Sequence, residues 1–74
     1  MKITQTMPES GQFVAVWEYN GLTWSSTHKF VGEALLRRND DPDLPGERKW
    51  LNASSDREFY ENNGATFIVM GESK

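Results

Sequence analysis

The sequence predicts an α+β fold with a small antiparallel or mixed β-sheet, an aromatic β-hairpin near the N-terminus and one or two short helices. Three observations support this prediction: Asn20-Gly21 lies between two runs rich in β-branched and aromatic residues, residues 55–58 carry a helix-start signature, and residues 65–70 are apolar and β-branched. A chain of 74 residues has room for one hydrophobic core. We therefore expect residues 1–74 to form a single domain.

The hairpin is predicted from residues 12–19 and 22–27, which flank Asn20-Gly21. This dipeptide favours a two-residue type I′ turn, because both central positions of that turn need a positive φ. Counting outward from the turn pairs Tyr19 with Leu22, Trp17 with Trp24, Ala15 with Ser26 and Phe13 with His28. One face of the hairpin is then aromatic and the other is half polar, so only the aromatic face must be core.

The segments on either side of the hairpin are less distinctive. Residues 2–6 are expected to form a short strand that completes a three-stranded start. Residues 29–38 fit two structures: apolar spacing and Arg37-Arg38 at the end slightly favour a helix, whereas Gly32-Glu33 suits a turn between two strands. Both alternatives stay open.

The second half of the chain begins with a loop at residues 39–46, predicted from its prolines, its glycine and its Asp and Asn residues. A short strand is expected at residues 48–51. Ser55 and Glu58 form a capping-box pattern, so we expect a helix that starts there and ends at Asn62-Asn63-Gly64.

The last apolar run, residues 65–70, is expected to be a central strand buried on both faces. Residues 71–74 form a polar tail.

Composition and charge exclude some classes of function and disfavour others. The chain has no cysteine and one histidine, so it lacks a thiolate metal site or an imidazole cluster, and no cofactor is expected. The net charge of -3 has the wrong sign for neutralising a nucleic-acid backbone. No apolar stretch approaches the length of a membrane span, and residues 1–6 lack the apolar core of a secretory signal. A cytoplasmic location is expected.

No residue pattern predicts an enzyme. His28 follows Ser25, Ser26 and Thr27, but adjacency in sequence does not build a triad, and a partly buried edge histidine is the simpler interpretation. Residues 41–52 imitate a calcium loop at three positions and lack two of its ligands, so a solvated acidic loop is favoured.

Residues 7–16, Met-Pro-Glu-Ser-Gly-Gln-Phe-Val-Ala-Val, together with Gly21 and Trp24, resemble the opening of a small family of uncharacterised domains encoded by tailed phages and prophages. That family typically has Leu where Met7 stands and an earlier Trp that is absent here. The resemblance implies a bacterial or phage origin, so that the expected cytoplasm is that of a bacterial host cell, and it implies no particular chemistry.

The aromatic residues suggest the main functional hypothesis, a non-enzymatic protein-binding module that acts as an accessory or inhibitor of a host or self protein. A core of this size accommodates about five or six large rings, so at least one Trp or Tyr is expected at the surface, where these residues anchor protein interfaces. Exposed carboxylates on the loop at residues 39–46 suit a basic partner. The candidate protein-binding residues are Trp17, Tyr19, Trp24, Trp50, Tyr60, Asp40, Asp41 and Asp43.

The alternative hypothesis is a single-stranded nucleic-acid-binding protein. Basic groups beside an aromatic ring hold a single strand by phosphate contact and stacking. Acidic residues in the same stretch would partly neutralise this patch, so a surface ion network is favoured over it. The candidate residues are Arg37, Arg38, Arg48, Lys49 and Trp50.

Overall fold

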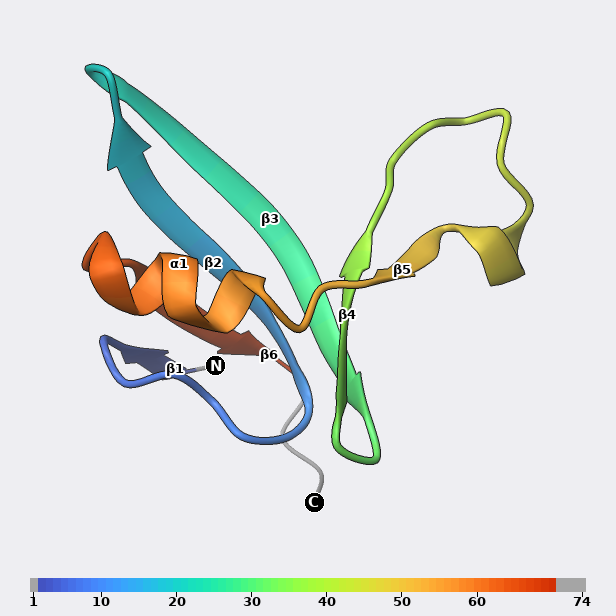
Figure 1. Cartoon of the computed structure of the whole chain (residues 1–74), viewed down its shortest axis with the longest axis horizontal. Helices are drawn as coiled ribbons and strands as arrows, with labels where there is room; N and C mark the ends of the chain where they lie inside the picture. Colours follow the sequence, from blue (N-terminus) through green and yellow to red (C-terminus); the bar gives the residue numbers. More distant parts are fainter. Residues whose placement is uncertain (1, 71–74) are drawn as a thin grey trace.

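The computed structural model describes residues 2–70, which form a small six-stranded antiparallel sheet with one short helix against one face (Figure 1). The strand order is β1-β6-β2-β3-β4-β5. The elements are β1 (Lys2–Thr4), β2 (Gln12–Tyr19), β3 (Leu22–Val31), β4 (Ala34–Arg38), the 3-10 turn η1 (Gly46–Arg48), β5 (Trp50–Asn52), α1 (Asp56–Asn62) and β6 (Thr66–Met70). The tail predicted at residues 71–74 lies outside the described residues.

The turn between β2 and β3 is Asn20-Gly21, and both residues have positive φ, 55° and 76°. The strands pair without a break from Tyr19 opposite Leu22 to Gln12 opposite Lys29. Aromatic residues on this hairpin do not share one environment, because Phe13 is buried whereas Tyr19 and Trp24 are exposed. The aromatic face is therefore core only in its half away from the turn.

Residues 29–38 are strand, and the helix favoured by the sequence is wrong. β3 runs to Val31, turns at Gly32-Glu33 and returns as β4, with Gly32 at φ 61°. The β3–β4 hairpin is favoured because the alternation of side chains along β4 buries Leu35 in the core. A helix at these residues would leave the backbone groups on the outer edge of β3 unpaired.

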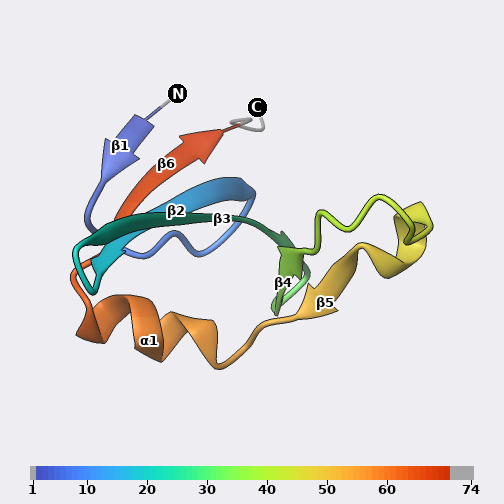
Figure 2. The same ribbon diagram turned by 90° about the horizontal axis from the view of Figure 1, so that it is seen from above.

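β1 does form near the N-terminus, but it does not join the hairpin as a third strand. It pairs with β6, which lies between β1 and β2. β6 is also not buried on both faces: Phe67 is buried under the helix, while Ile68 on the opposite face is half-buried. Figure 2 shows why, because α1 covers one side of the sheet and no described element covers the other.

The helix begins and ends close to the predicted positions, but the predicted capping box does not form. Ser55 has helical φ and ψ, and its side chain makes no capping hydrogen bond. Asn52 organises the entry instead, because its Oδ1 accepts hydrogen bonds from the Ser54 amide and hydroxyl at 3.1 and 2.9 Å. Gly64, at φ 62°, provides the left-handed residue just beyond the helix end.

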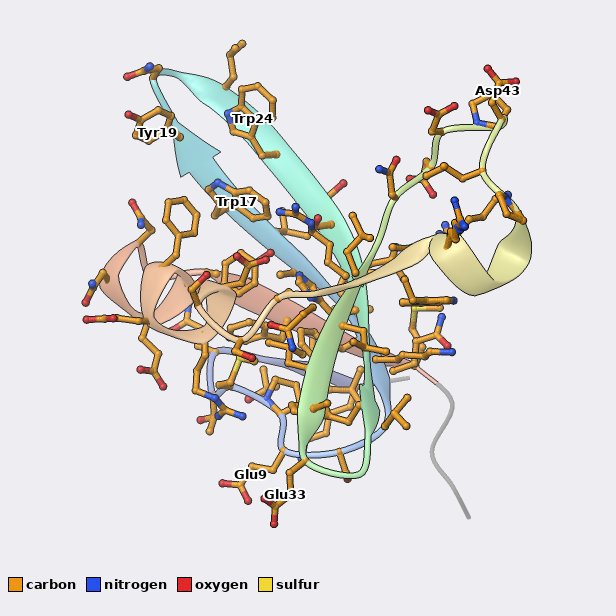
Figure 3. All side chains as sticks on the ribbon, turned by 45° about the vertical axis from the view of Figure 1, so that its right-hand side comes forward. Glu9, Trp17, Tyr19, Trp24, Glu33 and Asp43 are labelled. Carbon is orange, nitrogen blue, oxygen red and sulfur yellow. The ribbon has the colours of Figure 1, made fainter. Side chains whose placement is uncertain are left out.

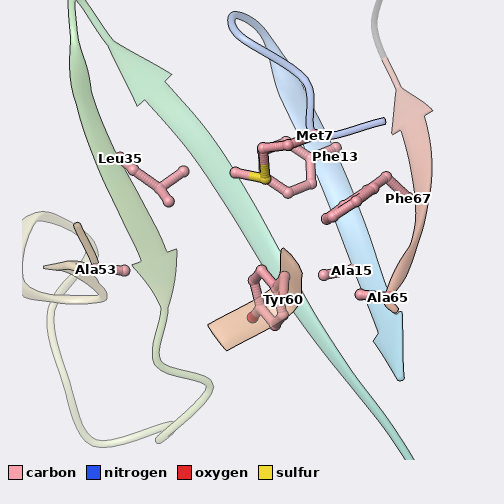
Figure 4. Packing of buried hydrophobic residues seen from close by; sticks show 8 residues of the cluster. All are labelled: Met7, Phe13, Ala15, Leu35, Ala53, Tyr60, Ala65 and Phe67. Atoms are coloured by element: carbon pink, nitrogen blue, oxygen red, sulfur yellow. The ribbon is translucent and has the colours of Figure 1, made fainter. Parts of the chain in front are cut away.

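The core lies between α1 and the covered face of the sheet (Figure 4). Tyr60 projects from the helix onto Phe67 and onto the central strands, where Phe13 stacks on His28 with ring centroids 5.2 Å apart. The buried apolar residues are Met7, Phe13, Ala15, Leu35, Ala53, Tyr60, Ala65 and Phe67.

Candidate functional site: the β2–β3 arm

The end of the hairpin extends beyond the rest of the sheet. β6 pairs with β2 only as far as Val16, and β4 pairs with β3 only from His28 onward. Residues 17–27, which we call the arm, are therefore a two-stranded ribbon with no third strand on either side among the described residues. In Figure 1 the arm projects past α1.

Apolar side chains are concentrated on one face of the arm. Tyr19, Leu22 and Trp24 have exposed fractions of 53%, 58% and 47%, and Phe59 of the neighbouring helix has 40%. Figure 3 shows Tyr19, Trp24 and Trp17 gathered along the ribbon. If about half of each side chain is exposed, these four residues present on the order of 300–400 Å² of apolar surface. A patch of that size is comparable to the largest apolar patch on a typical monomer, which is often functional.

The arm is held by contacts at its base and along its face. The Trp17 ring packs against Tyr60 at 5.0 Å and edge-on against Phe59 at 5.7 Å, between centroids. Nearer the turn, Trp24 Nε1 donates a hydrogen bond to the Tyr19 carbonyl at 3.3 Å. The exposed rings are thus positioned by the fold before any partner arrives, which lowers the entropic cost of binding.

A hollow of about 240 Å³ opens beside the arm, lined by Trp17, Arg37, Asp56, Phe59 and Tyr60. At its rim, Arg37 Nη1 lies 3.5 Å from Asp56 Oδ2. An aromatic floor with an ion pair at the edge can receive one side chain of a bound protein.

The one histidine does not provide catalytic chemistry here. His28 is fully buried in a central strand, which corrects the expectation of a partly buried edge residue. Its Nε2 lies 2.6 Å from the Tyr60 hydroxyl. Burial lowers the pKa of His28, against the smaller opposing effect of the Asp56 carboxylate, and burial raises the pKa of Tyr60 to about 12. Both groups are held neutral and away from solvent.

The candidate protein-binding residues do not share one surface. Trp17, Tyr19 and Trp24 belong to the arm, but Tyr60 is 2% exposed and is a core residue, so it offers a partner little surface beyond the floor of the hollow. Trp50 is half-buried on the uncovered face, where Lys29 Nζ lies 4.3 Å from its ring centroid.

The three candidate aspartates lie on the loop at residues 39–46, apart from the arm in Figures 1 and 3. Two of them have local partners: Asp40 Oδ1 accepts a hydrogen bond from Arg38 Nε at 2.8 Å, and Asp41 Oδ1 accepts one from the Asp43 amide at 2.9 Å. Among the side chains that the structure describes, no three are placed to hold a metal ion.

The basic residues of the nucleic-acid alternative are divided between surfaces. Arg37 and Arg38 are consecutive in β4, so they point to opposite faces of the sheet, and each is paired with an aspartate. Arg48 is exposed in η1, and Lys49 is half-buried after it. The structure does not bring these groups together as one patch.

Sequence reasoning missed two members of the arm surface, Leu22 and Phe59. The position of Leu22 opposite Tyr19 followed from the predicted turn, but its exposure did not. Phe59 directly precedes the buried Tyr60 in α1. Because consecutive residues of a helix face different directions, helix periodicity would have predicted that one of the two is buried and the other exposed.

A scan against protein-family models and searches of the curated proteins and of the solved structures found no match to this chain. The resemblance of residues 7–24 to phage and prophage domains gains no support from these comparisons. Within residues 2–70, no helix has the length and apolar character needed to cross a bilayer.

Proposed function

We propose that the protein is a small non-enzymatic binding module that docks on another protein through the aromatic arm. The observation that carries this proposal is the exposure of Tyr19, Leu22 and Trp24 on a ribbon that is rigidly packed at its base. Large aromatic side chains supply most of the energy at protein interfaces, and a patch of a few hundred Å² is enough to seed one.

The negative net charge favours a neutral or basic partner surface, since complementary charge speeds association. The partner is a host protein or a protein of the same origin, a second copy included, and the module acts by occupying its surface as an accessory or inhibitor protein. The bacterial or phage origin that residues 7–16 imply stays part of the proposal.

Capture from bacterial lysate with matched variants tests the proposal. We expect Trp24→Ala to remove at least one protein captured by the wild-type bait, because truncating an interface anchor costs about 2 kcal/mol or more. Val31→Ala is the control, because Val31 is 57% exposed at the far end of the same strand. A captured set that is identical for all three baits, with no self-association in the pure protein, would refute the arm as the docking surface.

A further inference from the structure

The outer edge of the arm is an unpaired strand edge. On the side of β3 away from β2, the pairing with β4 reaches no farther than His28, so residues 22–27 have no paired strand there among the described residues. Every second residue of a strand directs its amide and carbonyl to the same side. In the β2–β3 hairpin Tyr19 and Leu22 close the turn, so residues 22, 24 and 26 bond to β2. Thr23 and Ser25 direct their backbone groups outward.

This edge lacks the features that keep exposed strand edges from pairing. Natural edges are protected by shortness, charge, proline or a bulge. The other two edge strands of the sheet, β1 and β5, have three residues each, and β1 carries Lys2. Residues 22–27, Leu-Thr-Trp-Ser-Ser-Thr, contain no charge and no proline, and their one-to-one pairing with β2 excludes a bulge. The edge is suited to pairing.

We propose that this edge pairs antiparallel with the same edge of a second copy of the chain, around a twofold axis at Trp24. The inference rests on the proposed function and names its partner. Two boundaries fix the register, the turn at Gly21 and β4 beside His28. A register centred on Ser25 would place Leu22 of the second copy beside His28, where Arg37 already lies. The longest pairing that fits sets Trp24 opposite Trp24 and Thr23 opposite Ser25.

This register brings two of the exposed apolar residues of the arm, Leu22 and Trp24, to the interface. Trp24 meets its own copy in the close, non-hydrogen-bonded type of cross-strand pair, and Leu22 faces Ser26 of the second copy. Trp17 already pairs with Trp24 in each hairpin, so four indoles form one row across the two arms. Aromatic cross-strand pairs each contribute about 0.2–1 kcal/mol.

Charges on the uncovered face do not oppose the pairing. Glu18 lies opposite Thr23, on the face that also carries Arg38. Thr23 of the second copy lies beside Ser25, so Glu18 of that copy is three strands away from Arg38 of the first, about 14 Å across the sheet, and the two side chains do not meet. The twofold axis repeats this arrangement, so the centre of the interface, residues 22–26 of both copies, carries no charged side chain. Like charges are not juxtaposed, which would otherwise oppose self-association.

The contact is small, so the dimer is expected to be dynamic. An interface of two ribbons falls below the standard size of about 1,600 Å² and belongs to the transient class. We expect the weight-average mass in a sedimentation-equilibrium experiment to rise from one toward two chain masses as the concentration increases from about 10 µM to about 1 mM.

Proline substitution separates backbone pairing from side-chain contact. Ser25→Pro removes an amide that points outward and keeps the bonds to β2, because proline is tolerated on an edge strand when its missing N–H faced solvent. We expect Ser25→Pro to stay folded and to dimerise at least about tenfold more weakly. Ser25→Ala, which keeps the amide, should dimerise as the wild type does.

Amide hydrogen exchange of the wild-type protein is a second test of the self-pairing, and it does not require Ser25→Pro to fold. The amides of Thr23 and Ser25 should exchange rapidly in dilute protein and slow several-fold at high concentration, while those of Trp24 and Ser26 should not change. A monomer at about 1 mM, or unchanged exchange at Thr23 and Ser25 in a dimer, overturns the proposal. If Trp24→Ala still abolishes capture of a different protein, either result overturns the self-pairing and leaves the proposed function standing. Failure of the self-pairing and failure of the proposed function are therefore distinguishable.

Discussion

Removing the Tyr60 hydroxyl tests the buried polar contact at the centre of the fold. In Tyr60→Phe the ring keeps its packing against Trp17 and Phe67, but His28 Nε2 loses the hydroxyl that lies 2.6 Å away. The imidazole is fully buried, so water does not replace the lost partner. An orphaned buried polar group costs about 1–3 kcal/mol.

Thermal unfolding followed by tryptophan fluorescence measures this change. For a domain of this size, about 1 kcal/mol lowers the melting temperature by roughly 4–8 °C, so we expect a loss of about 5–20 °C. Tyr19→Phe is the control, because the Tyr19 side chain is largely exposed and loss of its hydroxyl should leave the stability nearly unchanged. Equal stability of Tyr60→Phe and wild type would refute the hydrogen bond.

The same pair gives the protein a predictable pH profile. The folded state lowers the pKa of His28, so the unfolded chain binds a proton first as the pH falls through about 6.5, and stability decreases there until the folded histidine also titrates. At high pH the unfolded chain releases the Tyr60 proton above the ordinary tyrosine pKa of 10.0, while the folded pKa is about 12. Stability should therefore fall between these values, by at most about 3 kcal/mol, and Tyr60→Phe should lack this alkaline loss.

Three further predictions concern the turn and the charged residues. Gly21→Val should lower stability by about 1–3 kcal/mol in thermal unfolding, because a β-branched residue is strained at φ 76° although nothing obstructs its Cβ; an unchanged melting temperature would contradict the turn geometry. Replacing Asp40, Asp41 and Asp43 together by Asn should change stability by less than about 1 kcal/mol, since Asn Oδ1 still accepts the loop hydrogen bond and the Arg38 pair is exposed; unfolding of this variant would show that the carboxylates are structural. A fluorescent single-stranded oligonucleotide should not bind at about 50 mM salt, and binding that weakens steeply with added salt would revive the nucleic-acid alternative.

Local chemistry was enough to predict the hairpin turn, the helix limits and the loop. Asn20-Gly21 determines a positive-φ turn, and the turn then determines which residues face each other, so Trp17 opposite Trp24 follows without tertiary information. The loop at residues 39–46 likewise follows from its Asx turns.

Features that depend on long-range pairing were not predictable. Residues 29–38 contain a helical spacing and a turn signal together, and the choice is made by the unpaired edge of β3. The pairing of β1 with β6 joins opposite ends of the chain, which no local pattern encodes. For the site, the sequence predicted more aromatic rings than the core can hold. It could not assign Tyr60 to the core and Trp24 to the surface, because that assignment depends on where α1 packs.

Site-specific photo-crosslinking in bacterial cells tests the central claim, that the arm contacts a protein, most directly. p-Benzoylphenylalanine placed at Trp24 reports any protein within reach of the arm, and the same group at Val31 reports the far end of the same strand, where exposure is similar. We predict a covalent adduct from position 24 and none from position 31, with the adduct mass showing whether the partner is a second copy. No adduct at position 24, or equal adducts at both positions, would contradict the claim.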